Sequence, residues 1–129
     1  MILLDTHIWI WWVQGDPRLT QQHQNYLSEY ETAGLGVSIY SCWEIAKLVE
    51  YKRLTLPYSL EDWFDRAFAY PGIQLIQLTL PIAIESTRLV EFHKDPADQI
   101  IVATAKVLGI SLLTADEKIL KYSGVKLLV

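Results

Sequence analysis

Apolar residues in this chain alternate between short continuous runs and longer segments with helical spacing. Short apolar runs bounded by turn residues are typical of strands buried on both faces, and they occur at 1–4, 36–39, 73–78, 110–113 and, at the edge, 125–129. Apolar residues three and four apart predict helices, here at 6–13, 19–33, 41–50, 60–69, 81–92, 97–108 and 114–122. This alternation predicts an α/β fold with a mostly parallel central sheet of about five strands.

Length and composition favour one compact domain that covers residues 1–129. The chain is 51% hydrophobic and contains no repeat, linker or low-complexity tract. No apolar stretch reaches the ~18 residues that a membrane span needs, and the first residues lack the basic region and cleavage site of a signal peptide. Cys42 has no second cysteine to pair with, and we interpret it as a small core residue. We therefore expect a cytoplasmic protein without a membrane span.

The charge balance narrows the possible partners. With 11 basic and 15 acidic residues, the formal charge is −4, which argues against a protein that coats nucleic acid non-specifically, since such proteins are normally basic. A nuclease is still compatible with this charge, because an acidic site would itself contribute part of it.

Four acidic residues stand beside the predicted elements in positions that lead to one edge of the sheet. Asp5 directly follows the first strand, Glu44 is early in the helix after the second, and Asp116 closely follows the fourth. In open α/β sheets, functional groups collect outside the carboxyl ends of the strands. Asp98 begins the helix before the fourth strand, so it reaches this edge only if the turn at Asp95-Pro96 brings the helix start there.

Carboxylates that converge in this way repel one another unless a divalent cation neutralises them. The pattern therefore predicts a Mg²⁺ or Mn²⁺ site that acts on phosphate esters. Asp95 is the alternative to Asp98, but an aspartate before proline is typical of a turn or helix cap. For His7 we expect a supporting or packing role, since these ions prefer oxygen ligands. Thr114 either donates to a carboxylate or only begins the turn.

Four segments, in order, resemble motifs of the PIN-domain ribonucleases, and more narrowly the toxin component of VapBC toxin–antitoxin pairs. They are Leu3–Trp12 with Gly15–Leu19, then Trp43–Lys47, His93–Ala105 and Leu113–Asp116. Each motif alone is weak, but together they span nearly the whole chain. The sequence departs from the pattern at three positions near the third motif: Lys94 and Gln99 replace arginines and Ala97 replaces an aromatic residue.

The resemblance implies a three-layer α/β/α sandwich and cleavage of single-stranded RNA by a Mg²⁺- or Mn²⁺-dependent endoribonuclease. It also implies a homodimer that a cognate antitoxin protein inhibits. The family's acidic positions fall on Asp5, Glu44, Asp98 and Asp116, which we take as both the catalytic and the metal-binding residues.

Two other functions are compatible with parts of the pattern. One is a non-catalytic, PIN-like module that binds RNA or a partner and whose acids only hold an ion. The other is an aspartyl-phosphate phosphatase, for which Asp5 fits, but the second acid of that motif is His7 here. Among the remaining residues, Trp9 and Trp12 are expected in the core or a dimer contact, and Lys47, Lys94 and Lys106 are candidates for phosphate contacts.

Overall fold

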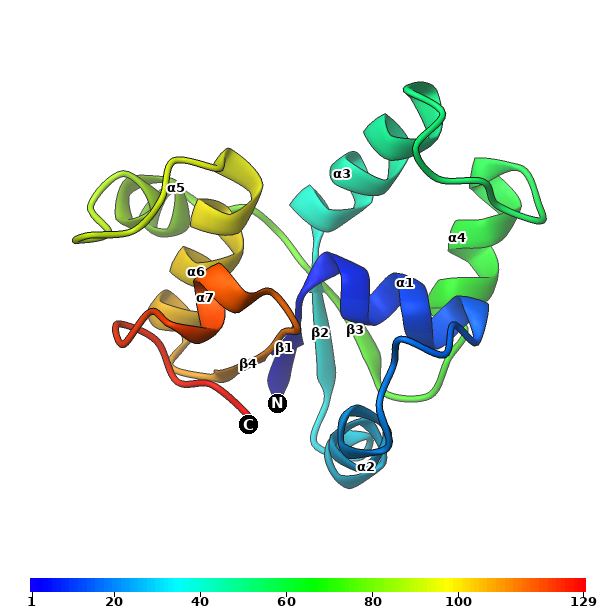
Figure 1. Cartoon of the computed structure of the whole chain (residues 1–129), viewed down its shortest axis with the longest axis horizontal. Coiled ribbons are helices and arrows are strands. Elements are labelled where there is room, and N and C mark those ends of the chain that lie inside the picture. Colours follow the sequence, from blue (N-terminus) through cyan, green and yellow to red (C-terminus); the bar gives the residue numbers. More distant parts are fainter.

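A computed structural model describes residues 1–129, which form a parallel four-stranded sheet between two layers of helices (Figure 1). The strand order is β3-β2-β1-β4, with β1 (Ile2–Leu4), β2 (Leu35–Ser38), β3 (Ile73–Ile76) and β4 (Ser111–Leu113). The helices are α1 (Thr6–Gln14), α2 (Gln21–Tyr30), α3 (Ile39–Glu50), α4 (Leu60–Phe68), α5 (Leu80–Ser86), α6 (Pro96–Leu108) and α7 (Glu117–Leu120). The expected α/β fold with a parallel sheet is confirmed.

Alternation along the central strand explains the two helical layers. Ile2 and Leu4 of β1 belong to one buried cluster with residues of α1, α2, α3 and α4, whereas Leu3 between them packs against α6 and α7. Successive side chains of a strand point to opposite faces, and here both faces meet apolar helices. Figure 1 shows the result, with α1, α3 and α4 on one side of the strands and α5, α6 and α7 on the other.

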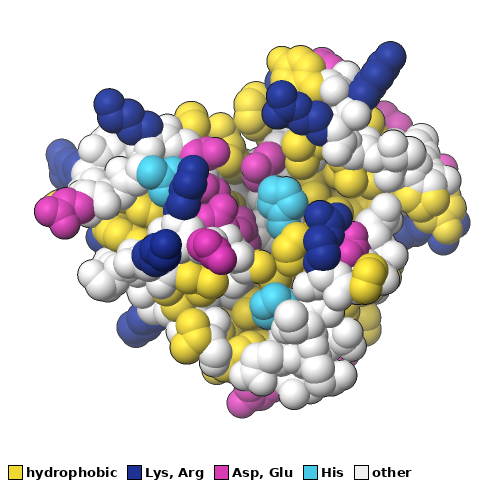
Figure 2. Space-filling view, in the orientation of Figure 1, with side chains coloured by type: hydrophobic (Ala, Val, Ile, Leu, Met, Phe, Trp, Pro, Cys, Tyr) yellow, Lys and Arg dark blue, Asp and Glu magenta, His cyan; other side chains and the backbone are white.

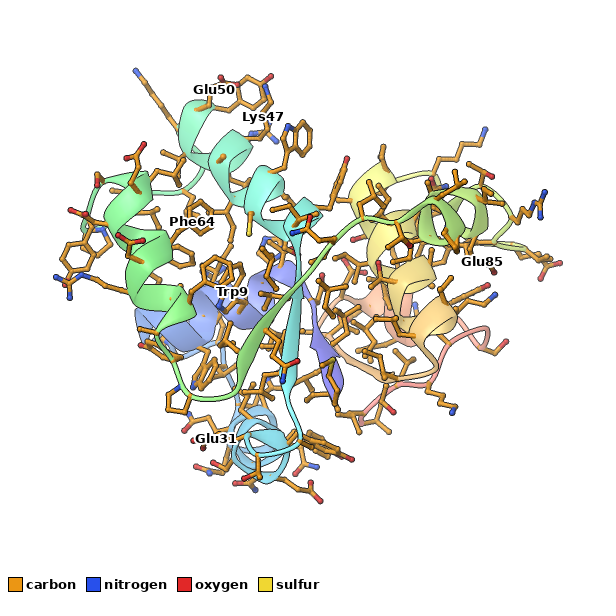
Figure 3. All side chains as sticks on the ribbon, turned by 180° about the vertical axis from the view of Figure 1, so that it is seen from behind. Trp9, Glu31, Lys47, Glu50, Phe64 and Glu85 are labelled. Atoms are coloured by element: carbon orange, nitrogen blue, oxygen red, sulfur yellow. The ribbon has the colours of Figure 1, made fainter.

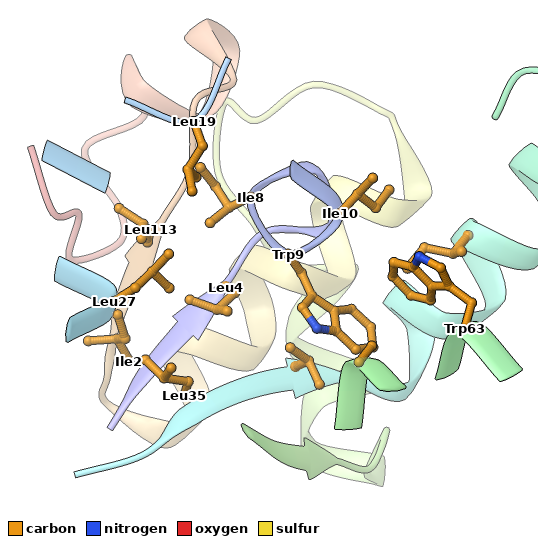
Figure 4. Packing of buried hydrophobic residues seen from close by; sticks show 13 residues of the cluster. Ile2, Leu4, Ile8, Trp9, Ile10, Leu19, Leu27, Leu35, Trp63 and Leu113 are labelled. Atoms are coloured by element: carbon orange, nitrogen blue, oxygen red, sulfur yellow. The ribbon is translucent and has the colours of Figure 1, made fainter. Parts of the chain in front are cut away.

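An aromatic group forms the larger core cluster. The ring of Trp9 lies 5.6 Å from that of Trp63 and 5.3 Å from that of Phe68, both in edge-to-face arrangements, which are favourable for aromatic pairs. Figures 3 and 4 show Trp9 buried between the sheet and α4. The expectation that Trp9 packs in the core is confirmed, and Trp12, half-buried, packs edge-to-face on Tyr70.

The predicted helix over 81–92 is too long, because α5 ends at Ser86. The hydroxyls of Ser86 and Thr87 donate to the carbonyls of Ala83 and Ile84, and such bonds compete with continuation of the helix. Pro81 is the second helical residue rather than the first. Residues 87–94 therefore form an irregular connection that leads into α6.

The last predicted strand is reduced to a single contact. Leu127 forms one isolated parallel bridge with Leu112, and the backbone of Leu112 bonds to Lys126 and Leu128. The segment 125–129 thus lies beside β4 at the expected edge of the sheet, without the length of a strand. None of the helices is both long and apolar enough to cross a membrane.

Candidate active site

The carboxyl ends of β1, β2 and β4 lie at one rim of the sheet, because the three strands run parallel and in register. Each of these ends leads directly to polar groups: Asp5 follows β1, Ser38 ends β2, and Thr114 follows β4. Figure 2 shows acidic side chains gathered around a hollow at the centre of this face, with histidine side chains beside them. The rim is therefore the place at which the predicted site residues are found.

Asp5 is the most buried of the four acids and is held by two hydrogen bonds. Its side chain caps α1 by accepting the N–H of Thr6 on Oδ1 (2.8 Å), while the hydroxyl of Thr114 donates to Oδ2 (2.6 Å). Burial raises the pKa of Asp5, partly offset by these two hydrogen bonds and by His7. Fixed in this way, the carboxylate has one defined orientation at the end of β1.

Thr114 joins two of the acids. Its hydroxyl donates to Asp5 and accepts the N–H of Asp116 (3.0 Å), and the residue is buried. The contact follows from the pairing of β1 with β4, in which Leu4 lies opposite Leu113. Of the two roles that the sequence left open, the structure therefore supports the hydrogen bond to a carboxylate.

Glu44 lies on α3, half-buried and one turn after the buried Ser41. The hydroxyl of Thr6 donates to that of Ser41 (2.8 Å), which ties the start of α1 to α3 beside Glu44. Burial raises the pKa of Glu44. A hydrogen bond with the Thr6 side chain partly offsets this rise, and the negative charge of Asp5 adds to it. Glu44 thus shares the electrostatic environment of Asp5, although the two residues come from different elements.

Asp98 and Asp95 have different surroundings, which separates their roles. Asp95 is the N-cap of α6, and its Oδ1 accepts the N–H groups of Ala97 (3.0 Å) and Asp98 (3.3 Å). The side chain of Asp98 is only 17% exposed. Burial, followed by the charges of Asp5, Asp95, Asp116 and Glu44, raises the pKa of Asp98 to about 7. Asp98 therefore lies where the negative charges of the rim add together.

His93 is a neighbour of Asp98 that sequence reasoning did not single out. Its Nε2 is buried and lies 3.1 Å from Oδ2 of Asp98, yet it is not oriented for a hydrogen bond. The amide of Gln99, at one of the positions that depart from the family motif, donates to the carbonyl of His93 (3.1 Å). Gln99 thus fastens the connection before α6 to the helix, and His93 is kept against the acids.

Asp116 also has a structural role, as the N-cap of α7. Its Oδ1 accepts the N–H groups of Lys118 (2.8 Å) and Ile119 (3.2 Å). Together with Asp5, His7, Trp11 and Ala115, it lines a cavity of about 180 Å³ at the rim. His7 is exposed at this cavity, so its place is at the site rather than in the core.

The four predicted acids lie close enough to influence one another's charge, but they do not form one set of metal ligands. Asp98 senses the charges of the other three, yet no group of three or more histidine, cysteine, aspartate or glutamate side chains is positioned to hold a metal ion. The donor set fits Mg²⁺ or Mn²⁺ in its chemistry, because it offers carboxylate oxygens and excess negative charge. Coordination by several of these acids at once would require their side chains to move inward.

Two of the three lysines proposed for phosphate contacts are engaged elsewhere. Lys47 pairs with Glu50 (2.9 Å) on the outer end of α3, and Lys106 pairs with Glu85 (3.1 Å) between α6 and α5. Figure 3 labels Lys47, Glu50 and Glu85. Lys94 is exposed just before α6. Two further lysines, Lys118 and Lys121, lie close to the rim on the segment after Asp116. Sequence reasoning did not identify them, although their position shortly after Asp116 could have indicated that they lie near the site.

Comparisons with known proteins agree with this architecture. The PIN domain family matches residues 2–125. Ribonuclease VapC22 of Mycobacterium tuberculosis is 29% identical over 119 residues, which cover 92% of this chain and 88% of the relative.

Among solved structures, VapBC2 from Rickettsia felis bound to a promoter DNA fragment superposes with a TM-score of 0.72 at 14% identity, covering 99% of this chain and 98% of the other. A toxin–antitoxin complex from Klebsiella pneumoniae gives 0.70 at 22% identity, with 100% and 97% covered. FitAcB from Neisseria gonorrhoeae gives 0.70 at 19% identity, with the same shares covered. At these identities the structural likeness bears on the fold, and function has to be argued from the site.

Proposed function

The chain belongs to the PIN domain family, and we propose that it is a divalent-metal-dependent endoribonuclease that cleaves single-stranded RNA, the toxin of a toxin–antitoxin pair. The observation that carries the proposal is the acidic rim: Asp5 and Asp116 line one cavity, and the partly buried Asp98 lies within reach of the charges of Asp5, Asp95, Asp116 and Glu44. Carboxylates concentrated in a cleft disfavour one another's ionised form, and a divalent cation between them removes this repulsion. The name of the ribonuclease relative supports RNA as the substrate.

Asp5, Asp98 and Asp116 would hold the ion directly, and Glu44 directly or through a water molecule. When bound, Mg²⁺ or Mn²⁺ supplies a positive charge that promotes deprotonation of the attacking water and stabilises the charge that develops on the phosphate. The protein's own groups set the orientation: the hydroxyl of Thr114 and the N–H of Thr6 fix the two oxygens of Asp5. Orientation of this kind reduces the entropy cost of reaching the reactive geometry.

The raised pKa values predict that the metal-free protein loses stability as the pH rises. The pKa of Asp98 is about 7 in the folded state against 3.8 for a free carboxyl group, so the folded chain binds a proton that the unfolded chain has released. The resulting stabilisation is complete below about pH 4 and is lost as the pH rises through 7, by at most ~1.4 kcal/mol per pH unit. Asp5 and Glu44 shift in the same direction. Thermal melting in chelator between pH 5 and 8 measures this effect.

Millimolar Mn²⁺ should then raise the melting temperature more at pH 8 than at pH 5, because ion and proton compete for the same oxygens. Asp98→Asn should reduce both the pH dependence and the stabilisation by Mn²⁺. If the wild type and this variant melt identically with and without the ion, the acids do not bind it as proposed.

We also propose that a cognate antitoxin silences the site by placing a basic side chain among the acids. The hollow is lined by Asp5 and Asp116, with Asp98 beside it, and an arginine can pair with a carboxylate through two parallel hydrogen bonds. A partner that co-purifies with the chain should therefore lose affinity when its cleft-facing arginine or lysine is replaced by glutamine. A partner whose cleft-facing residues are all neutral or acidic would contradict the proposal.

The alternative is a non-catalytic module that binds RNA or a partner, and the lack of a ready-made ligand cage bears equally on both functions. The two functions differ in one measurable property, since only the nuclease cleaves RNA when the ion is supplied. If the chain is a nuclease, replacement of the acids abolishes cleavage. If it is a binding module, neither the wild type nor the variants cleave RNA.

A further inference from the structure

We propose that the cavity between residues 90–93 and 118–123 is a subsite for the RNA nucleotide next to the cleaved phosphate, with Lys118 and Lys121 binding the backbone phosphate and Phe92 stacking on the base. The inference rests on the proposed nuclease function and names residues that would position its substrate. The cavity measures about 350 Å³, which lies within the ~300–1,000 Å³ range of pockets that hold small ligands.

Both walls of the cavity continue directly into the acidic rim. On one wall, His93 faces the cavity and its Nε2 lies 3.1 Å from Oδ2 of Asp98. On the other wall, the backbone N–H of Lys118 donates to Oδ1 of Asp116 (2.8 Å). An RNA strand that passes from the acids along this surface therefore enters the cavity within one or two nucleotides of the site.

The charge of this cavity is suited to phosphate. Lys118 and Lys121 are exposed, line the cavity and take part in none of the ion pairs of the structure. They are three residues apart, so they project from the same side of the α7 turn. Glu91 is the one acid in the lining. In a chain with a net charge of −4, two unpaired lysines beside an acidic site form a local feature rather than part of a generally basic surface.

The apolar part of the cavity is aromatic. The ring centroid of Phe92 lies 4.8 Å from that of Tyr122 and 4.4 Å from that of His93, and all three residues line the cavity. Proteins that bind single-stranded nucleic acid combine a positive groove that follows the backbone with aromatic side chains on which bases stack. Lysines and aromatic rings on facing walls meet this requirement for a single nucleotide.

An RNA strand fits the surface better than an antitoxin segment. RNA carries a phosphate at every nucleotide, so one phosphate can reach the acids and their cation while the next reaches the lysines. A protein segment that is basic enough to enter the acidic hollow would be repelled by Lys118 and Lys121 next to it. A surface with an acidic centre, where a cation binds, and a basic flank therefore suits a ligand that carries a negative charge at regular intervals, as RNA does.

The test measures binding of a short, unstructured, fluorescent RNA to the full chain carrying Asp5→Asn, so that cleavage does not interfere. In this background Lys118→Gln/Lys121→Gln should weaken binding at least about tenfold at low salt. It should also reduce the slope of log K against log salt by about 1.4, the value for two phosphate contacts on a single strand. The matched control is Lys52→Gln/Lys126→Gln, two exposed lysines that take part in none of the ion pairs and do not line this cavity, and it should leave the slope unchanged.

Stacking has its own test. Phe92→Leu keeps an apolar side chain and should weaken binding about fivefold without changing the salt slope. This loss should disappear with an RNA that is abasic at the nucleotide beside the cleavage position. Equal losses for the complete and the abasic RNA would mean that Phe92 acts only through packing, and would overturn the stacking role.

The outcomes separate this inference from the proposed function. If the parent protein binds no RNA and the wild type cleaves none, the nuclease function fails and the subsite fails with it. If the parent binds RNA and the two lysine pairs give the same affinity and slope, the subsite alone is overturned. A loss of affinity for a co-purified antitoxin, with RNA binding unchanged, would equally overturn it and assign the cavity to protein contact.

Discussion

Replacement of Asp5 by asparagine is expected to reduce RNA cleavage by roughly a hundredfold or more while the protein stays folded. Under the proposed mechanism, the loss of one metal-binding charge removes several kcal/mol of transition-state stabilisation, on the usual scale for metal-assisted hydrolysis. The fold should survive because burial raises the pKa of Asp5, which means that the ionised carboxylate itself is unfavourable there. Melting temperature and cleavage rate, measured on the same preparation, separate the two effects, and growth arrest on expression should disappear.

Glu117→Gln provides a matched control for this variant. Glu117 is an exposed acid in the first turn of α7, so its replacement removes the same charge one residue away from Asp116 without touching the site. Its cleavage rate should stay close to that of the wild type. A folded Asp5→Asn protein that cuts RNA at the wild-type rate would contradict the proposed role of the four acids.

Asp98→Asn should greatly reduce cleavage and Asp95→Asn should not, although the two residues are only three positions apart. Asp98 is the acid on which the charges of the rim converge, so its replacement should reduce cleavage as severely as that of Asp5. Asp95 caps α6 through two backbone N–H groups, and asparagine caps helices nearly as well as aspartate. Asp95→Asn should therefore change stability by less than ~1 kcal/mol and cleavage far less than Asp98→Asn does.

Asp95→Ala extends this comparison to stability. It removes the cap entirely and should lower the free energy of unfolding by about 1 kcal/mol, which chemical denaturation measures. An inactive Asp95→Asn protein together with an active Asp98→Asn protein would show that the wrong member of the pair has been assigned to the metal.

The regular part of the fold could be predicted because local signals agreed with it. The apolar run at Ile2–Leu4 predicted a strand buried on both faces. The predicted helices over 60–69 and 97–108 correspond to α4 and α6, where Ser59 caps the start of α4 and Gly109 caps the end of α6. The end of α5 could not be predicted, because it depends on whether the hydroxyls of Ser86 and Thr87 turn back to the helix carbonyls or to solvent.

The site was predictable in its acids and not in what surrounds them. Asp5 and Asp116 closely follow strand ends, which is a local property, and the strand register brings these ends to one rim. Glu44 and Asp98 instead come to the rim on α3 and α6. The hydrogen bond between Thr114 and Asp5 joins residues 109 positions apart, so no pattern along the chain could specify it. The cavity beside the acids depends on the path of residues 87–94, an irregular connection with no periodic signal.

We propose that this chain cleaves RNA with a divalent cation held by Asp5, Glu44, Asp98 and Asp116. To test this, the purified chain, freed of any antitoxin, is incubated with an unstructured RNA in Mn²⁺, in excess EDTA, and in EDTA followed by excess Mn²⁺, with Asp5→Asn as the control for contaminating nucleases. We predict internal cleavage in Mn²⁺, none in EDTA, recovery when the ion is restored, and none with the variant under any condition. Cleavage that persists in EDTA, or that Asp5→Asn shares in full, would contradict the claim.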